Sequence, residues 1–154
     1  MRIACLTAVF ALVACAKADQ KPVDTPASAT TPPPPTAPTV NVADLKGTWA
    51  AKAMPMNRDT VLTTLELTTN GTEQGWVTTL PNGAKAKMTV LSVSGDSVIT
   101  QSDTFASATR KGQRVSVHSI MHFKGDSVTG LIHAKYLNGD TATLRILGAR
   151  KAAK

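Results

Sequence analysis

Two methionines and two histidines are the residues of this 154-residue chain whose spacing best suits metal chemistry. Met54 and Met56 lie in the stretch MPMNRD, and thioether sulfur is a ligand for soft ions such as Cu(I). His118 and His133 face each other across a predicted hairpin, with Cβ atoms expected about 5 Å apart, close enough to share a zinc ion. Each pair supplies only two ligands, which is too few to complete a metal site. We therefore predict no metal and no cofactor, and keep Cu(I) at Met54 and Met56 as a minor alternative.

Acid–base and nucleophilic catalysis have little support in the sequence. Asp96, Asp126 and Asp140 fall in predicted turns, where a short carboxylate bonds the local backbone. The chain contains no His-Glu-x-x-His, no Gly-x-Ser-x-Gly and no glycine loop of the kind that holds phosphate. We predict that the protein is not an enzyme.

The charge balance is basic, with 17 Lys and Arg against 10 Asp and Glu and a net charge of +7. Nucleic-acid binding is a common cause of such a balance. Here much of the excess lies near the ends of the chain, and aromatic residues that could stack on bases make up only 4% of it. We predict no nucleic-acid partner and expect an anionic lipid surface instead.

The N-terminus has the features of a secretory signal that ends at a cysteine. A positive charge at Arg2 precedes an apolar run, residues 3–14, that is too short to cross a bilayer as a helix. The final LVAC resembles the lipobox of bacterial lipoproteins, whose cysteine carries acyl chains such as palmitate. The resemblance implies a signal peptide over 1–14 and a lipid-bilayer partner through acylated Cys15. Because Ala16 and not Asp follows, it also implies the outer membrane, facing the periplasm.

Three further segments follow the predicted signal. Residues 15–42 are predicted to be a disordered linker, because the stretch has no large aromatic residue and contains four consecutive prolines. Residues 43–150 are predicted to form the folded domain and residues 151–154 a basic tail. Both cysteines, Cys5 and Cys15, precede the domain, which therefore has no thiol for disulfides or catalysis.

The folded domain is predicted to be all-β. From Lys46 onward, short β-branched runs alternate with NG, GD and KG turn signals, and no helical periodicity persists beyond a turn or two. Strands are expected at residues 47–54, 60–69, 74–80, 85–93, 97–109 with a kink at Asp103, 113–123, 126–136 and 140–148.

The predicted turns can be checked against side-chain alternation. A tight turn at Gly125-Asp126 and a loop with Gly139 in the left-handed region give one shared apolar face. That face holds the pairs Phe123–Val128, Val117–Ala134 and Val115–Tyr136, followed by Ala142, Leu144 and Ile146. Loops at Arg110-Lys111-Gly112 and Asn70-Gly71 are expected to set Phe105 opposite Val117 and Leu67 opposite Trp76. Eight sequential antiparallel strands joined by short turns predict a closed up-and-down barrel.

The first strand carries a further signal, Gly47-Thr48-Trp49. It resembles the Gly-x-Trp that opens the barrels of the calycin group, which includes lipocalins and avidins. The resemblance implies that Trp49 closes one end of the barrel with an arginine from the last strand across its ring. Arg145 and Arg150 are the candidates, although Arg145 has outward parity and Arg150 lies past the predicted strand. The residues after Trp49 lack the polar groups of avidins, so biotin binding is not implied.

Two functional hypotheses remain open. The first is a carrier of a small apolar molecule, in which the lining residues are Met54, Met56, Trp76, Met121 and Tyr136. The loop with Met54 and Met56 is expected to cover the mouth of the barrel, as the first loop does in lipocalins, because flexible thioethers suit a lid over an apolar ligand. The second is a filled barrel that acts as a structural or protein-interaction module of the cell envelope through its outer face. Eight strands are compatible with both, because their interior is filled by side chains or holds one small ligand.

Overall fold

The computed structural model describes residues 39–152, and the predicted signal, Cys15 and most of the predicted linker lie outside them. A 3₁₀ turn, η1 (Val42–Leu45), precedes nine strands. These are β1 (Gly47–Pro55), β2 (Thr63–Thr69), β3 (Trp76–Thr79), β4 (Lys85–Ser94), β5 (Ser97–Ser102), β6 (Phe105–Ala106), β7 (Arg114–Lys124), β8 (Ser127–Tyr136) and β9 (Thr141–Arg150). Among residues 39–152 no helix is long and apolar enough to cross a bilayer.

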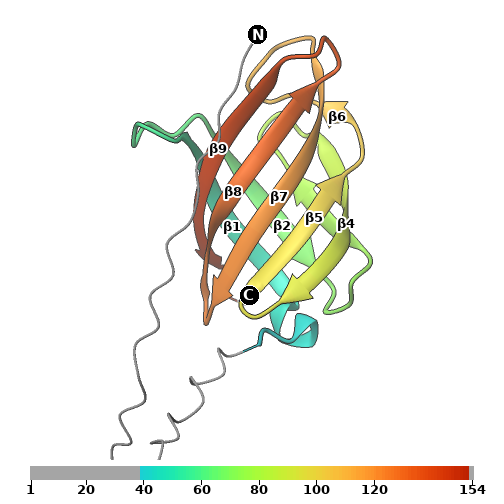
Figure 1. The fold of residues 1–154 in the computed structure, drawn as a ribbon, viewed down its shortest axis with the longest axis vertical. Coiled ribbons are helices and arrows are strands. Elements are labelled where there is room, and N and C mark those ends of the chain that lie inside the picture. Colours follow the sequence, from blue (N-terminus) through green and yellow to red (C-terminus); the bar gives the residue numbers. More distant parts are fainter. Residues whose placement is uncertain (1–38, 153–154) are drawn as a thin grey trace, which may run out of the picture. The chain divides into compact units, whose positions relative to one another are not determined.

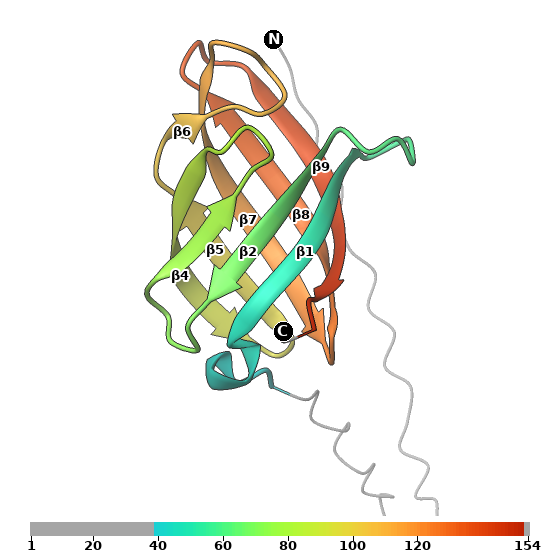
Figure 2. The same cartoon turned by 180° about the vertical axis from the view of Figure 1, so that it is seen from behind.

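The strands close into the predicted eight-stranded antiparallel up-and-down barrel (Figures 1 and 2). β1 to β5 pair in sequence order, as do β6 to β9, and β1 pairs with β9. β5 and the two-residue β6 do not pair with each other, and both pair with β7. β5 and β6 are thus two parts of one kinked strand. Asp103 makes the kink, because its backbone N–H donates to the Lys87 carbonyl while its carboxylate accepts from the Lys87 N–H.

The register of the β7–β8 hairpin is confirmed. Phe123 faces Val128, Val117 faces Ala134 and Val115 faces Tyr136. The turn at Gly139, with φ of +93°, also keeps Ala142 opposite Ala134. These pairs place alternate residues inside the barrel, as the apolar pattern requires.

Two predicted cross-strand pairs are wrong by two residues. Leu67 faces Thr78, not Trp76, and Phe105 faces Val115, not Val117. Both loops are wider than expected because side chains organise them. The Asn70 carboxamide accepts from the Thr72 N–H, and the Ser107 hydroxyl accepts from two backbone N–H groups of its loop. A shift of two keeps each residue on its predicted face.

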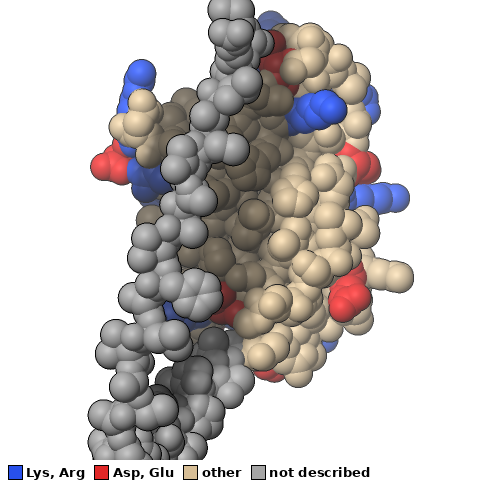
Figure 3. All heavy atoms as spheres, in the orientation of Figure 1, with Lys and Arg blue, Asp and Glu red and all other residues tan. Residues whose placement is uncertain are grey.

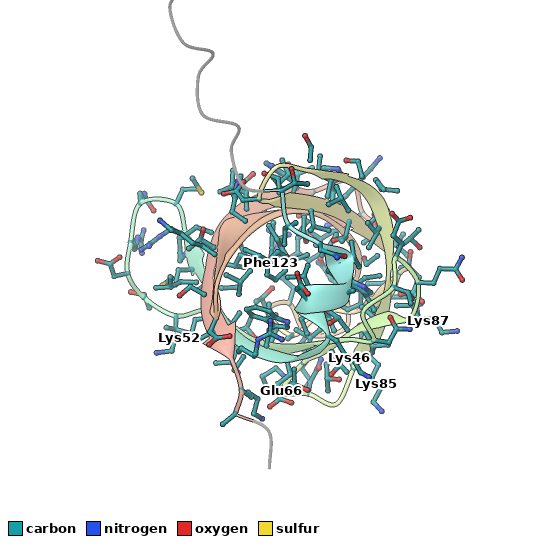
Figure 4. All side chains as sticks on the ribbon, turned by 90° about the horizontal axis from the view of Figure 1, so that it is seen from below. Lys46, Lys52, Glu66, Lys85, Lys87 and Phe123 are labelled. Carbon is teal, nitrogen blue, oxygen red and sulfur yellow. The ribbon has the colours of Figure 1, made fainter. Side chains whose placement is uncertain are left out.

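One end of the barrel is filled by three aromatic side chains, which we call the floor: Trp49, Trp76 and Phe123. Both tryptophans are fully buried, and Phe123 meets each of them edge to face, with ring centroids 4.9 and 6.3 Å apart. Each indole N–H is satisfied, by the Leu45 carbonyl at 3.0 Å and the Thr72 carbonyl at 2.6 Å. Figure 4 looks along the barrel and shows Phe123 within the ring of strands.

Arg150 covers the floor from outside. Its guanidinium carbon lies 4.2 Å from the centre of the Trp49 ring, and its nitrogens donate to the carbonyls of Lys46 and Asp44. Strand β9 runs two residues further than predicted, and this extension brings Arg150 onto the ring. The contact between Trp49 and an arginine that the resemblance led us to expect is therefore present. Arg150 makes it, and Arg145, the other candidate, does not.

Candidate functional site

A cavity of about 90 Å³ lies inside the barrel above the floor. Its deeper part is lined by Leu67, Met88, Ser119 and Met121, and its upper part by residues that include Phe105, Val115 and Tyr136. Most of the lining is apolar. Cavities of roughly 150 Å³ with similar lining bind benzene or xenon, so this one has room for a smaller guest or for part of a single-chain molecule.

The loop between β6 and β7, residues 107–113, closes the cavity at the end opposite the floor. We call this loop the lid. Ser107 and Thr109 line the cavity from above, and the Thr109 hydroxyl lies 3.1 Å from the Tyr136 hydroxyl. Arg110 stacks over the Tyr136 ring at 4.1 Å and pairs with Asp140 at 2.6 Å. Tyr136 thus serves both as cavity wall and as the surface on which the lid rests.

Asp140 is the acidic partner in this closure. The Asn138 carboxamide, and after it the Arg110 guanidinium, donate to its carboxylate and hold the pKa of Asp140 below its ordinary value of 3.8. The carboxylate is therefore charged at neutral pH, as the ion pair with Arg110 requires.

The five residues predicted to contact a ligand occupy three different places. Met121 and Tyr136 line the cavity. Trp76 belongs to the floor and does not line the cavity. Met54 is buried and Met56 is 54% exposed, and neither lines the cavity either. Ligand contact by any of the five stays a prediction.

The segment that carries Met56 projects from the side of the barrel in both views of the fold (Figures 1 and 2). Arg145 holds it there from the outer face of β9, donating to the carbonyls of Pro55 and Arg58 and pairing with Asp59. This loop therefore does not cover the mouth of the barrel, where a methionine lid was expected. Cu(I) binding by the two methionines remains untested.

The predicted histidine pair forms on the outer face of the barrel. His118 faces His133 across β7 and β8, with ring centroids 6.3 Å apart, and the His133 ring bonds the Thr143 hydroxyl. Among residues 39–152 no group of three or more His, Cys, Asp or Glu is placed to hold a metal. His122 is engaged elsewhere, because its ring lies 3.1 Å from Asp96 and is the main cause of the lowered pKa of that carboxyl.

The outer surface is charged unevenly. The outside of β1 to β4 carries Lys52, Glu66, Lys85 and Lys87, which point away from the ring of strands in Figure 4. The visible part of the face that β7 and β8 present in Figure 3 has charged side chains mainly at its margins. A partly exposed apolar row crosses it, made by Ile99, Ile120 and Leu131 in register.

Sequence inspection did not identify the residues that close the cavity. Ser107, Thr109 and Arg110 lie in a stretch, SATRKGQ, in which only the Arg-Lys-Gly turn was recognised. The available signal was Ser-x-Thr, whose hydroxyls commonly bond backbone N–H groups two or three residues ahead. Comparison with protein-family models, with curated proteins and with solved structures found no match to this chain.

Proposed function

We propose that this chain is a lipid-anchored protein of the cell envelope whose barrel binds a small apolar molecule without chemically changing it. The observation that carries the proposal is the apolar cavity of about 90 Å³ between an aromatic floor and a lid with its own hydrogen bond and ion pair. A mostly apolar cavity with a few polar groups at its edge is the usual form of a small-molecule site. The anchor rests on the LVAC resemblance and Cys15, and the expected outer-membrane location rests on Ala16.

The binding test uses stability as its readout, because a guest that binds only the folded chain stabilises it by mass action. The full chain carrying Cys15→Ser, which cannot be acylated, is unfolded in urea with and without octanol, a single-chain apolar probe of which only part would lie in the cavity. Octanol at about 100 times its dissociation constant should add about 2.7 kcal/mol to the free energy of unfolding.

A pair of matched variants locates the binding. Ala134 lines the cavity, whereas Ala106 is exposed on β6 and does not. Ala134→Leu should abolish the stabilisation by octanol and Ala106→Leu should preserve it. If octanol stabilises neither the parent chain nor the Ala106 variant, the binding function is wrong.

The alternative function is an interaction module that works through the outer face. The row of Ile99, Ile120 and Leu131 favours it, because an uncharged, partly apolar surface is common where proteins associate. On this alternative, Ile120→Lys would abolish capture of an envelope partner and leave octanol binding unchanged.

A further inference from the structure

When β5 and β6 are counted as one strand, β2 and β3 form the shortest ladder between neighbouring strands of the barrel. Their ladder has only three pairs, from Glu66–Thr79 to Thr68–Val77. Beyond it, residues 63–65 of β2 pair with β1 alone. β3 ends at Thr79, and the chain leaves the β2–β3 ladder in a turn that begins at Leu80. The Gly83 N–H closes this turn by donating to the Leu80 carbonyl at 2.9 Å. Between residues 63–65 of β2 and the chain after Leu80, the barrel wall is therefore closed by side chains and not by a backbone ladder. We call this part of the wall the side gap.

Leu65 and Leu80 are the side chains that fill the side gap. Both line the inner cavity, and both also line a groove of about 690 Å³ on the outside of the barrel. The bed of this groove is made by small residues of β1 and β9, Ala50, Gly148 and Ala149. Two leucines thus separate the inner cavity from a much larger outer hollow.

The side gap is a less costly entrance than the mouth. Opening the lid breaks the Thr109–Tyr136 hydrogen bond, the stacking of Arg110 and its ion pair with Asp140. The side gap is closed by the aliphatic side chains of Leu65 and Leu80, which form no hydrogen bonds, so we expect rotamer changes of these two leucines to open it. Side-chain rotation is also faster than the movement of a whole loop.

The outer groove has its own charge preference. Lys52 lines it and pairs with no carboxylate among the described residues. Glu66 lines it too, but Lys151 neutralises that carboxylate at 2.6 Å. Figure 4 shows Lys52 and Glu66 outside the ring of strands. The groove therefore has an excess positive charge, which favours an anionic group.

We propose that the guest is a single-chain amphiphile with an anionic head group, which enters through the side gap. Its apolar chain passes between Leu65 and Leu80 into the cavity, and its head group stays in the outer groove beside Lys52. The proposal rests on the binding function above and adds to it the route, the orientation and the chemical class of the guest.

Orientation can be measured with the protein's own fluorescence, because both tryptophans of the chain lie in the floor. The probes are two octanoates, one brominated at the terminal carbon and one beside the carboxylate. The heavy atom quenches an indole only at short range. In the full Cys15→Ser chain, terminal bromine should quench the tryptophans strongly and bromine beside the carboxylate should not. Equal quenching by both probes would overturn the proposed orientation.

The head-group contact is tested by comparing octanoate with octanol. Lys52→Gln should weaken octanoate binding about threefold, the effect of one exposed charge pair, and leave octanol binding unchanged. Lys87→Gln is the matched control, since Lys87 is exposed on β4 outside the groove. If Lys52→Gln and Lys87→Gln behave alike, the anionic head group is not held at Lys52.

The route is tested by association rates from stopped-flow quenching. Leu80→Ala widens the side gap, whereas Leu144→Ala removes the same atoms from a residue that lines the cavity alone. Leu80→Ala should raise the association rate several-fold over the parent, and Leu144→Ala should not. Equal rates in the two variants would reject the side entrance. Failure of both octanol and octanoate to bind would instead reject the binding function itself.

Discussion

Truncation of Arg150 should destabilise the whole barrel, because this side chain ties together the floor, the turn before β1 and the end of β9. It lies 4.2 Å from the centre of the Trp49 ring and donates to the Lys46 carbonyl at 2.6 Å and the Asp44 carbonyl at 2.7 Å. It also pairs with Asp126 at 2.9 Å. Arg150→Ala removes all four contacts.

The contacts of Arg150 differ in strength. The cation–π contact is partly desolvated, since the Arg150 side chain is only 26% exposed, and contributes about 1 kcal/mol. Its two carbonyl contacts are charge-assisted and together contribute about 1.5–3 kcal/mol. The Asp126 side chain is 82% exposed, so that ion pair contributes less than about 1 kcal/mol. Because neighbouring contacts are not additive, we expect Arg150→Ala to cost about 3 kcal/mol.

Urea unfolding followed by tryptophan fluorescence measures this cost, and the native emission of the variant should shift to longer wavelength as Trp49 becomes hydrated. Three further variants test the reasoning. Arg150→Lys keeps the charge but cannot reach both carbonyls, and should recover less than half of the loss. Asp126→Asn should cost less than about 1 kcal/mol. Arg114→Ala, which removes one exposed contact to the Thr104 carbonyl, should cost about as little. A loss below about 1 kcal/mol for Arg150→Ala, or an equal loss for Asp126→Asn, would refute this account of the barrel end.

Two other predictions concern the lid and the tightly packed side of the barrel. Because hydrogen bonds from Asn138 and Arg110 lower the folded-state pKa of Asp140, the lid contact should be fully present above pH about 4 and lost as the pH falls through values below 3.8. Amide hydrogen exchange of residues 107–113 as a function of pH measures the loss of the lid contact. Asp140→Asn should remove this acid dependence, and if the dependence persists in that variant, a group other than Asp140 causes it. Ala51 is packed against Gly148, where an added Cβ would come within 2.6 Å of the Ala51 Cβ, so Ala51→Val should cost about 1–3 kcal/mol by overpacking. Differential scanning calorimetry measures that cost, and a neutral effect would mean that the β1–β9 seam has unfilled space.

The barrel was predictable because its hairpins are local. Alternation in β7 and β8 fixes which side chains face inward, and the turn at Gly125-Asp126 fixes their register without any information from the rest of the chain. The position of Trp49 at a closed end was also predictable from Gly-Thr-Trp. In contrast, the pairs at Leu67 and Phe105 were wrong because Asn70 and Ser107 widen their loops through side-chain bonds that residue type alone does not specify.

The closure and the side gap could not be predicted for a different reason. The lid depends on Thr109 meeting Tyr136, 27 residues away. The gap depends on where the β2–β3 ladder ends, which is decided by the geometry of the loops at both ends of those strands. Likewise, the Met56 loop was expected over the mouth, but Arg145, 86 residues after Asp59, holds it outside. Contacts between residues so far apart in the chain produce no periodic pattern in the sequence.

Native mass spectrometry of the Cys15→Ser chain, secreted by a bacterial host with a cleavable signal in place of residues 1–14 and purified without detergent, tests the central claim most directly. The account predicts an added mass from a bound molecule that organic solvent releases and that is negatively charged once free. The Ala134→Leu protein should lack this added mass. The bare chain mass in both proteins, with no uptake of added octanol or octanoate, would contradict the claim that this barrel is built to hold a guest.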